Sequence, residues 1–158
     1  MVRIKSRWIL FELTQDPILQ NDQVVEQNIP LLINERMISQ ALKQSNEITF
    51  GEMGVGLLKF TNVKWYNPET RIGILRTPRE FADMLLASMF FVKQIETIPC
   101  HFNILQVSGT IVFIQKYAIE RDRSFYLKEQ EKMEKLGKTL NIVDKIQTST
   151  HQINSIAR

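Results

Sequence analysis

Cations near the beginning of the sequence are the first residues whose type and spacing could do chemistry. Arg3, Lys5 and Arg7 stand two residues apart in the opening segment MVRIKSRWILFEL. Because neighbouring side chains of a strand point to opposite faces, these cations share one face, and the apolar residues from Ile9 onward continue it. We therefore expect a strand that runs from an exposed basic end into a core. That end could bind an anion, or it could simply keep the terminus in water.

A second group of cations falls at the ends of other expected strands. These residues are Lys59, Lys64, Arg71, Arg76 and Arg79. The segment KWYNPETR places Trp65 and Tyr66 among them. Since Lys and Arg bind phosphates and aromatic rings stack on bases, this group is typical of a nucleic-acid interface. In the alternative interpretation the cations are solvated edge charges and Trp65 belongs to the core.

The segment VSGT is a third candidate, because a strand is expected to end there and a helix to begin. Gly109 permits a tight turn between the two. Free amides at a helix start favour an anion such as a phosphate. In the alternative interpretation, Ser108 or Thr110 satisfies those amides as an ordinary cap.

Residues for metal binding or nucleophilic catalysis are scarce and badly spaced. His101 and His151 are far apart, and no Cys/His spacing typical of zinc is present. The glycines of residues 51–56 match neither a dinucleotide fingerprint nor a phosphate loop. Cys100 precedes His101, but adjacent strand residues point to opposite faces, so we expect a buried thiol. Catalysis by this chain alone is not expected.

The composition is that of one globular domain and permits nucleic acid as a partner. The 158 residues are 44% apolar and 23% charged, with a net charge of +3 and a pI of about 9.1. One cysteine fits a reducing compartment, and the opening segment is too short for a secretory signal. The longest apolar-rich stretch, FADMLLASMFFV, is far short of a membrane span. We expect a soluble intracellular protein with no membrane partner.

Hydrophobic periodicity and turn signals divide the chain into seven major elements. In chain order they are a strand at 4–13, a helix at 29–46, strands at 57–66 and 71–76, a helix at 80–95, a strand at 101–107 and a helix from 111. The first six match a split βαβ pattern. We therefore predict an α+β, RNA-recognition-like or ferredoxin-like βαββαβ sandwich. Its four-stranded antiparallel sheet would carry two helices on one face, with an extra C-terminal helix over the other face or a rim.

Local signals refine these boundaries. Pro30 is expected in the first turn of the first helix, and the glycine-rich segment FGEMGVG is expected to end that helix. The residues from Thr77 to Glu80 are typical of a capping box, with Pro78 at the first helical position. The segment 14–28 is expected to be a polar loop.

Three regions follow from these patterns. Residues 1–123 form the predicted RNA-recognition-like domain, and residues 124–143 form a charged helical extension that stops near Gly137. Residues 144–158 are polar and unpatterned, so we expect a mobile tail.

Four segments together resemble a known family. They are MVRIKSRWILFEL, FGEMGVG, VKWYNPETRIGILRTPREF and ILQVSGTI. In combination and order they resemble the Pop-five protein subunit of ribonuclease P and ribonuclease MRP, in its eukaryotic branch. The resemblance covers residues 1–123. This sequence departs from the family at Trp8, where tyrosine is usual, and at Thr77 and Pro78, where cysteine and another cation are frequent.

The resemblance implies a function. Such a protein is a non-catalytic subunit of an RNA-based endonuclease that removes the 5′ leader of precursor tRNA, and the MRP particle cleaves precursor rRNA. Catalysis belongs to the RNA and its Mg²⁺ ions, so no cofactor bound by this chain is expected. The implied partners are the catalytic RNA, a TIM-barrel-like protein subunit and other subunits of the particle. The implied localisation is the nucleus and the nucleolus.

The candidate RNA-binding residues combine the three sites above. They are Arg3, Lys5, Arg7, Lys64, Arg71, Arg76, Arg79, Ser108, Gly109 and Thr110. In the alternative function the chain is a purely protein-bridging scaffold without direct RNA contact, which the mixed charge of the last helix favours. A standalone RNA-recognition domain is a third alternative, but the usual aromatic-rich signature is absent.

Overall fold

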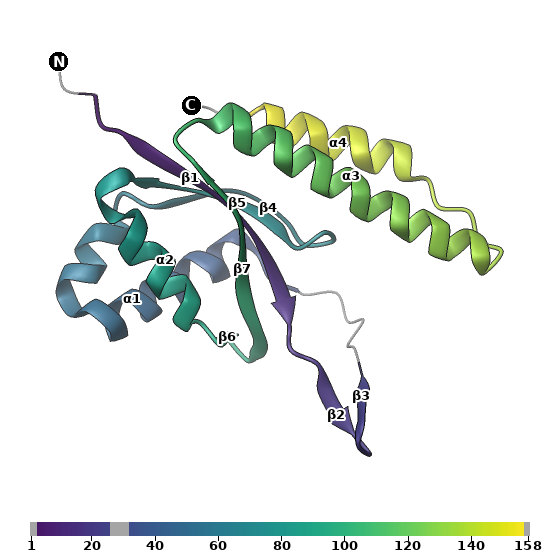
Figure 1. Cartoon of the computed structure of the whole chain (residues 1–158), viewed down its shortest axis with the longest axis horizontal. Helices are drawn as coiled ribbons and strands as arrows, with labels where there is room; N and C mark the ends of the chain where they lie inside the picture. The colour runs from purple at the N-terminus through teal and green to yellow at the C-terminus, as the bar shows by residue number, and fades with distance from the viewer. Residues whose placement is uncertain (1–2, 26–31, 157–158) are drawn as a thin grey trace.

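A computed structural model describes residues 3–25 and 32–156 of the chain (Figure 1). An antiparallel sheet lies between two layers of helices. The elements, in chain order, are β1 (Ser6–Gln15), β2 (Ile18–Gln20), β3 (Gln23–Val25), α1 (Glu35–Leu58), β4 (Asn62–Asn67), β5 (Ile72–Pro78), a 3₁₀ turn (Arg79–Phe81), α2 (Ala82–Phe91), β6 (Gln94–Ile95), β7 (Ile98–Ser108), α3 (Ile111–Lys135) and α4 (Ile142–Asn154). This order contains all seven predicted elements and confirms an α+β fold.

The main sheet has five strands in the order β4-β5-β1-β7-β6, not the four that we predicted. The additional strand is the two-residue β6, which pairs with β7 through Gln94 and Ile95. Glu96 has a φ of 54°, so the chain reverses there and folds β7 back along β6. The predicted hairpin of β4 and β5 is confirmed, with antiparallel pairing from Asn62 to Asn67.

Strand β1 is the centre of the sheet and is buried on both faces. Ile9, Phe11 and Leu13 pack in the core under α1 and α2, whereas Trp8 and Leu10 pack under α3. This alternation is the one that the opening segment predicted. It brings the basic residues before Trp8 to one end of the sheet.

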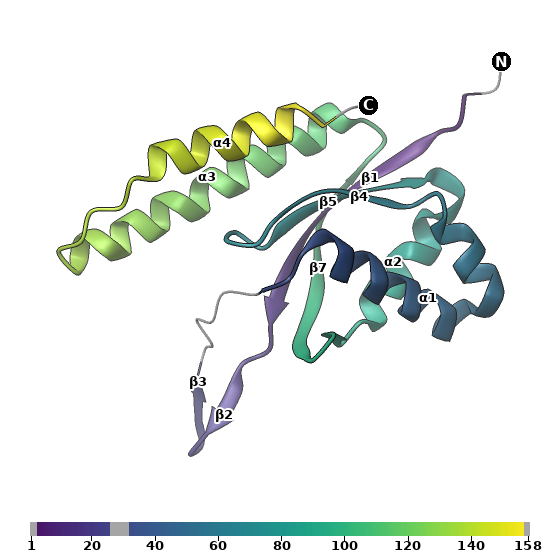
Figure 2. The same ribbon diagram turned by 180° about the vertical axis from the view of Figure 1, so that it is seen from behind.

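The two helix layers cover opposite faces of the sheet (Figure 2). Helices α1 and α2 cover one face, where the Ser45 hydroxyl donates to the Ser88 carbonyl at 2.7 Å. Helix α3 covers the other face, with α4 packed against it. A last helix over the far face was predicted, but the second helix beside it was not.

Helix α1 differs from the prediction at both ends. It begins at Glu35, because the Asn34 side chain caps it by accepting from the Met37 amide at 3.0 Å. The predicted role of Pro30 lies outside the described residues. The segment FGEMGVG does not end the helix but kinks it at Gly51, whose φ is 65°, and α1 continues to Leu58. The next strand therefore begins at residue 62 and not at 57.

The predicted capping box at residues 77–80 is wrong. Thr77 is fully buried in β5 and pairs with Arg7 of β1, and its hydroxyl lies 3.0 Å from that of Thr61. Because the sheet takes Thr77, a 3₁₀ turn follows and α2 is limited to Ala82–Phe91.

The segment 144–158 was predicted to be an unpatterned tail, and this prediction is wrong for its described residues. Helix α4 covers residues 142–154 and buries Ile142, Ser149 and Ile153. The intervals of seven and four residues between them place all three on one helix face. Helix α3 runs from Ile111 to Lys135 across the boundary predicted at residue 123, and it stops near Gly137, as expected.

Candidate nucleic-acid interface

A cleft of about 520 Å³ opens where the start of β1 meets the end of β5 and the turn between β7 and α3. Residues 3–8, Arg76 and residues 109–112 line this basic cleft. Its lining includes four cations, Arg3, Lys5, Arg7 and Arg76, and no carboxylate. The sheet register creates this site, because Trp8 of β1 lies opposite both Arg76 and Ser108.

Arg76 is held in place in the lining of the basic cleft. Its Nε donates to the Ser6 hydroxyl at 3.2 Å, and its guanidinium lies 5.5 Å from the centroid of the Trp8 ring. A cation over an aromatic face is attracted by the negative potential of the ring. Arg76 is therefore positioned before any ligand arrives, although it remains half-buried and able to donate further hydrogen bonds.

Arg7 occupies the space beside Gly109. A side-chain carbon added to Gly109 would lie 3.0 Å from Nη1 of Arg7. The predicted strand-start and VSGT sites are therefore one site. Arg3 and Lys5 lie farther out on the exposed arm that precedes β1. Arg79 lies near that arm, since its backbone amide donates to the Lys5 carbonyl at 2.8 Å.

The start of α3 forms another wall of the basic cleft. Ser108 accepts from the Thr110 amide at 3.1 Å, but the Thr110 side chain makes no capping hydrogen bond to the first turn. The ordinary-cap interpretation therefore accounts for the amide of Thr110 alone. Amides in a first helical turn favour negative charge, as the cations of this cleft also do.

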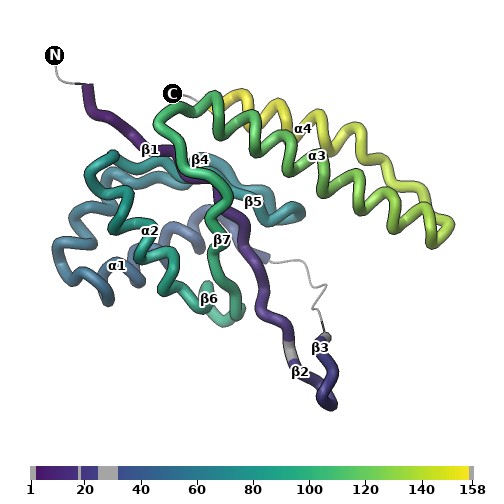
Figure 3. Tube along the Cα trace, viewed as in Figure 1, coloured from purple at the N-terminus to yellow at the C-terminus, as the bar shows by residue number. Residues whose placement is uncertain are grey.

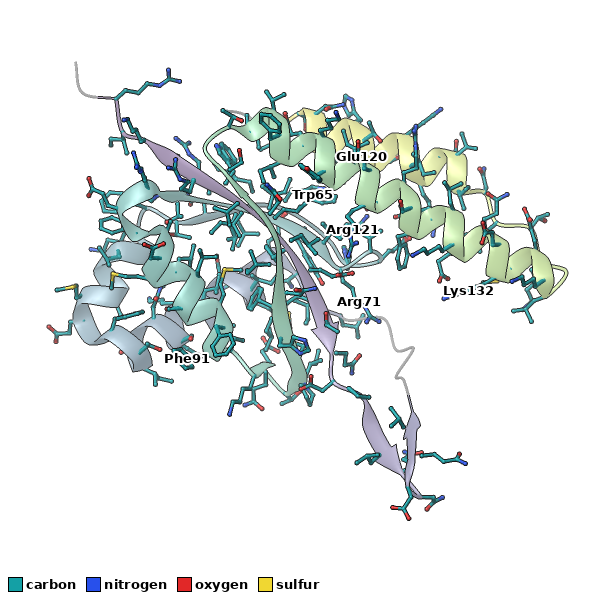
Figure 4. The ribbon with its side chains drawn as sticks, in the orientation of Figure 1. Trp65, Arg71, Phe91, Glu120, Arg121 and Lys132 are labelled. Carbon is teal, nitrogen blue, oxygen red and sulfur yellow. The ribbon has the colours of Figure 1, made fainter. Side chains whose placement is uncertain are left out.

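Lys64 and Arg71 are not part of the basic cleft. Lys64 lies in β4 at a register shift between Val63 and Trp65. Arg71 precedes β5 at the opposite end of the sheet, where its carbonyl accepts from the Leu13 amide at 2.8 Å. Figure 4 shows Arg71 on the same side as Lys132, away from the beginning of the chain.

A second cleft, of about 770 Å³, surrounds Arg71 and has a balanced charge. Its lining includes three carboxylates and three cations, which are Glu12, Glu69, Glu129, Arg71, Lys132 and Lys145. A phosphate would meet repulsion there as well as attraction. This contrast with the basic cleft makes the basic cleft the better candidate for RNA.

The two aromatic residues expected to stack on bases are core residues. Trp65 is 5% exposed and Tyr66 is 7% exposed. The Trp65 indole donates to the Gln152 side chain of α4 at 3.2 Å, and Figure 4 shows Trp65 beneath the helix layer. Burial raises the pKa of Tyr66 well above its usual range. The alternative interpretation, in which Trp65 is core, is therefore confirmed.

Sequence reasoning did not anticipate a polar cluster that links α3 and α4 to the β4–β5 turn. The Asn67 side chain donates to Asp122 at 3.3 Å, and the Tyr126 hydroxyl donates to Glu69 at 3.3 Å. Lys145 of α4 lies 2.9 Å from the same Glu69 carboxylate. Burial raises the pKa of Asp122, and it raises the pKa of Tyr126 to about 12. The cluster fixes the helix layer to the sheet, so its role is structural.

Cys100 and His101 do not form a catalytic pair. Cys100 is fully buried, and burial raises the pKa of its thiol. His101 is exposed on β7, where its Nδ1 lies 2.8 Å from Asp16. Within residues 3–25 and 32–156 no group of three or more His, Cys, Asp or Glu residues could hold a metal ion. None of the helices described there is long and apolar enough to cross a membrane.

The chain is similar to known proteins in sequence and in structure. The model of the Rpp14/Pop5 family matches residues 7–119. The chain is 31% identical over 142 residues to the probable ribonuclease P/MRP protein subunit POP5 of Arabidopsis thaliana, covering 89% of this chain and 87% of that protein. It is 29% identical over 133 residues to the ribonuclease P/MRP protein subunit POP5 of Schizosaccharomyces pombe, covering 78% and 90%.

More distant similarities agree with these. The chain is 29% identical over 115 residues to ribonuclease P protein component 2 of Pyrococcus abyssi, covering 73% of this chain and 85% of that protein. It also superposes on a chain of the cryo-EM structure of yeast ribonuclease MRP with a TM-score of 0.50 and 14% identity, covering 78% of this chain and 96% of that chain. At this identity the superposition supports the fold alone.

Proposed function

This chain belongs to the Rpp14/Pop5 family, and on that premise we propose that it is a non-catalytic protein subunit of ribonuclease P and ribonuclease MRP. In the first particle it would serve the removal of the 5′ leader from precursor tRNA. In the second it would serve the cleavage of precursor rRNA. Catalysis then belongs to the particle's RNA and its Mg²⁺ ions, and this chain needs no cofactor of its own.

The basic cleft is the observation that carries direct RNA contact. Arg3, Lys5, Arg7 and Arg76 converge there with the start of α3 and without a carboxylate in the lining. Contacts of this kind to phosphates fix the position of an RNA without reading its bases. The proposed role is to brace the catalytic RNA at its backbone.

The layer of α1 and α2 supports a protein partner, for which we propose the TIM-barrel-like subunit. Ile48 is 86% exposed and Phe90 is 80% exposed, and Met53, Phe60 and Phe91 are exposed as well. Figure 4 shows Phe91 at the C-terminal end of α2. Exposed apolar side chains that belong to neighbouring elements are typical of a protein interface.

The purely protein-bridging scaffold remains the second candidate function. Helix α3 favours it, since its exposed face carries cations and carboxylates in turn, as in the pair of Lys132 and Glu129 at 3.1 Å. In this alternative the cations of the basic cleft face solvent, and the chain joins the particle through proteins alone.

Ultraviolet crosslinking in cells that express the tagged full chain tests the proposal. We expect the purified particle to contain the ribonuclease P and MRP RNAs, with crosslinks at residues 3–8 and 109–112, and imaging to place it in the nucleus and nucleolus. Recovery of both RNAs without a crosslink to the chain would favour the scaffold. Recovery of neither RNA would refute both functions.

A further inference from the structure

A two-stranded hairpin projects from the end of β1 that lies opposite the beginning of the chain (Figures 1 and 3). Strands β2 and β3 pair with Leu19 opposite Val24 and Gln20 opposite Gln23. Asn21 and Asp22 form the turn, with φ values of 51° and 59°. Positive φ at both central residues is the geometry of a type I′ turn, whose twist matches that of the paired strands.

The hairpin is separate from the rest of the described fold. Its strands form a sheet of their own, and neither of them pairs with the main sheet. Leu19 is 72% exposed and Val24 is 65% exposed, although the two side chains lie directly across the hairpin from each other. An isolated two-stranded hairpin is marginally stable at best in water, so a surface outside the described fold is needed to stabilise it.

The charge of the hairpin favours a protein over RNA as that surface. Residues 18–25, which form the hairpin, contain one carboxylate, Asp22, and no Lys, Arg or His. A phosphate backbone would be repelled there, because no cation within the hairpin offsets the Asp22 carboxylate. The hairpin therefore differs in sign from the basic cleft at the other end of β1.

The size of the hairpin argues against a second copy of this chain as the occupant. Strands β2 and β3 with their turn span the eight residues 18–25. A stable protein interface takes about 20–30 residues from each side. The hairpin alone cannot hold a dimer together, but it can add to a contact with a protein that the chain also meets elsewhere.

We propose that the hairpin is a docking arm that places Leu19 and Val24 in an apolar groove on a neighbouring protein subunit, with a neutral or basic rim facing Asp22. The arm is distinct from the exposed residues of α1 and α2. The proposal rests on the proposed function only for the presence of a neighbouring subunit.

A photocrosslinking amino acid at position 19 of the full chain tests where the arm docks. The tagged chain is expressed in cells and the intact particle is irradiated after purification, with position 20 as the matched site on the other hairpin face. We expect position 19 to crosslink to a protein that mass spectrometry identifies as a stoichiometric component of the particle, and position 20 to crosslink far less. Crosslinks to RNA or to a second copy, or no crosslink, would overturn the proposal.

A pair of double variants supplies a second measurement. In L19S/V24S we expect the crosslinked neighbour to be lost from the particle about tenfold more readily in a salt wash, because two apolar contacts are removed. Q20S/Q23S should retain it as the wild type does. Equal retention of the crosslinked neighbour by both double variants would contradict the proposed docking of the hairpin.

The recovered RNA separates this proposal from the proposed function. If L19S/V24S loses the neighbour and keeps the particle's RNA, the arm is supported as a protein contact. If the wild-type chain recovers a crosslinked protein neighbour but no RNA, the arm stands and the proposed function fails.

Discussion

At the scale of single residues, the shape of the basic cleft depends on Gly109, because the absence of a side chain there makes room for a cation. Gly109 leaves the space that the Arg7 guanidinium fills. Its φ is not in the left-handed region, so the position could accept a side chain without backbone strain. Gly109 therefore matters for where Arg7 lies and not for how the chain turns.

Substitution of Gly109 tests this arrangement. We expect Gly109→Val to weaken RNA binding while changing the free energy of unfolding by less than about 1 kcal/mol, because the displaced atom is the mobile end of a side chain. Affinity for the particle's RNA and urea denaturation measure the two effects. Gly56→Ala is the control, since a side-chain carbon there meets nothing within 4 Å. A loss of stability in step with the loss of affinity would make the turn purely structural.

Asp122 is the residue whose burial gives stability a pH dependence. Its pKa in the folded protein is raised, chiefly by burial, so the folded state binds a proton more tightly than the unfolded state does. Stability therefore falls as pH rises from the ordinary Asp pKa of about 3.9 through the raised pKa of the folded protein.

An amide at this position tests the assignment. We expect Asp122→Asn to flatten the free energy of unfolding across that pH window, because Asn carries no ionisable group while its carbonyl can still accept from Asn67. Urea denaturation at a series of pH values measures the profile. Asp122→Ala should instead lower stability at every pH, since it leaves hydrogen-bonding partners unsatisfied. An unchanged slope in Asp122→Asn would assign the pH dependence to another group.

At the scale of elements, the basic arm of residues 3–7, which leads into β1, carries positive charge that can be removed separately from the rest of the fold. Arg3 and Lys5 are exposed and Arg7 is half-buried at the strand start. Each phosphate that a cation neutralises releases counterions, at a slope of roughly −0.7 per phosphate on single-stranded RNA. Three contacts would contribute about two units to the slope of log affinity against log salt.

Replacement of Arg3, Lys5 and Arg7 by alanine tests the arm. We expect the salt dependence of RNA binding to flatten by about two units, with little change in stability. Affinity across a salt series measures the slope, with the partner subunit present. Alanine at Lys128, Lys135 and Lys138 removes the same net charge from exposed positions at the far end of α3 and just after it, so it controls for charge alone. Parallel lines for the wild type and the arm variant would mean that the arm does not touch RNA.

Helix α4 was not predicted, because most residues of its segment are polar. Its apolar stripe has only a few isoleucines among polar residues, and Ile153 lies fully buried against α3 and the sheet. We expect Ile153→Ala to lower the free energy of unfolding by about 2–4 kcal/mol, as for other buried large-to-small changes. Val143→Ala on the exposed side should cost less than about 0.5 kcal/mol. Equal effects in urea denaturation would contradict the packing of α4.

The elements that could be predicted are those whose own residues indicate which faces are buried and where the chain turns. Strand β1 alternates between two cores, and the hairpin of β4 and β5 surrounds a clear turn at NPET. The prediction of a capping box failed because Thr77 pairs with Arg7 and so belongs to the sheet. This pairing depends on β1, which is distant in sequence and gives no local signal near Thr77. The turn at Asn21 and Asp22 was a local signal that could have identified the β2–β3 hairpin.

At the scale of the whole molecule, the residues of the candidate site could be predicted from the sequence, but which of them lie close together could not. A strand has two ends, and the sequence does not state which ends meet. The sheet register brings Arg76 to Trp8 and leaves Arg71 beside Leu13, at the other end of β1. The burial of Trp65 likewise required α4, which was not anticipated.

The exposed apolar residues of α1 and α2 give a prediction about the whole chain. We expect the isolated chain to be poorly soluble, and co-expression with the TIM-barrel-like subunit to raise its soluble yield. Phe90→Ser with Phe91→Ser should raise the solubility of the isolated chain and weaken that pairing. Leu127→Ser, at an exposed site on α3, is the control. A wild-type chain that is equally soluble and monomeric alone would argue against an obligate partner.

Strand β1 also sets a fixed distance between the basic cleft and the hairpin. Its ten residues, Ser6–Gln15, rise by about 3.3 Å each, so about 30 Å separates the basic cleft from the base of the hairpin. Both of its edges are hydrogen-bonded to neighbouring strands, and one inserted residue would turn every later side chain to the wrong face. Homologous chains can therefore vary the hairpin in length and sequence, but the spacing between its base and the cleft should be invariant among them.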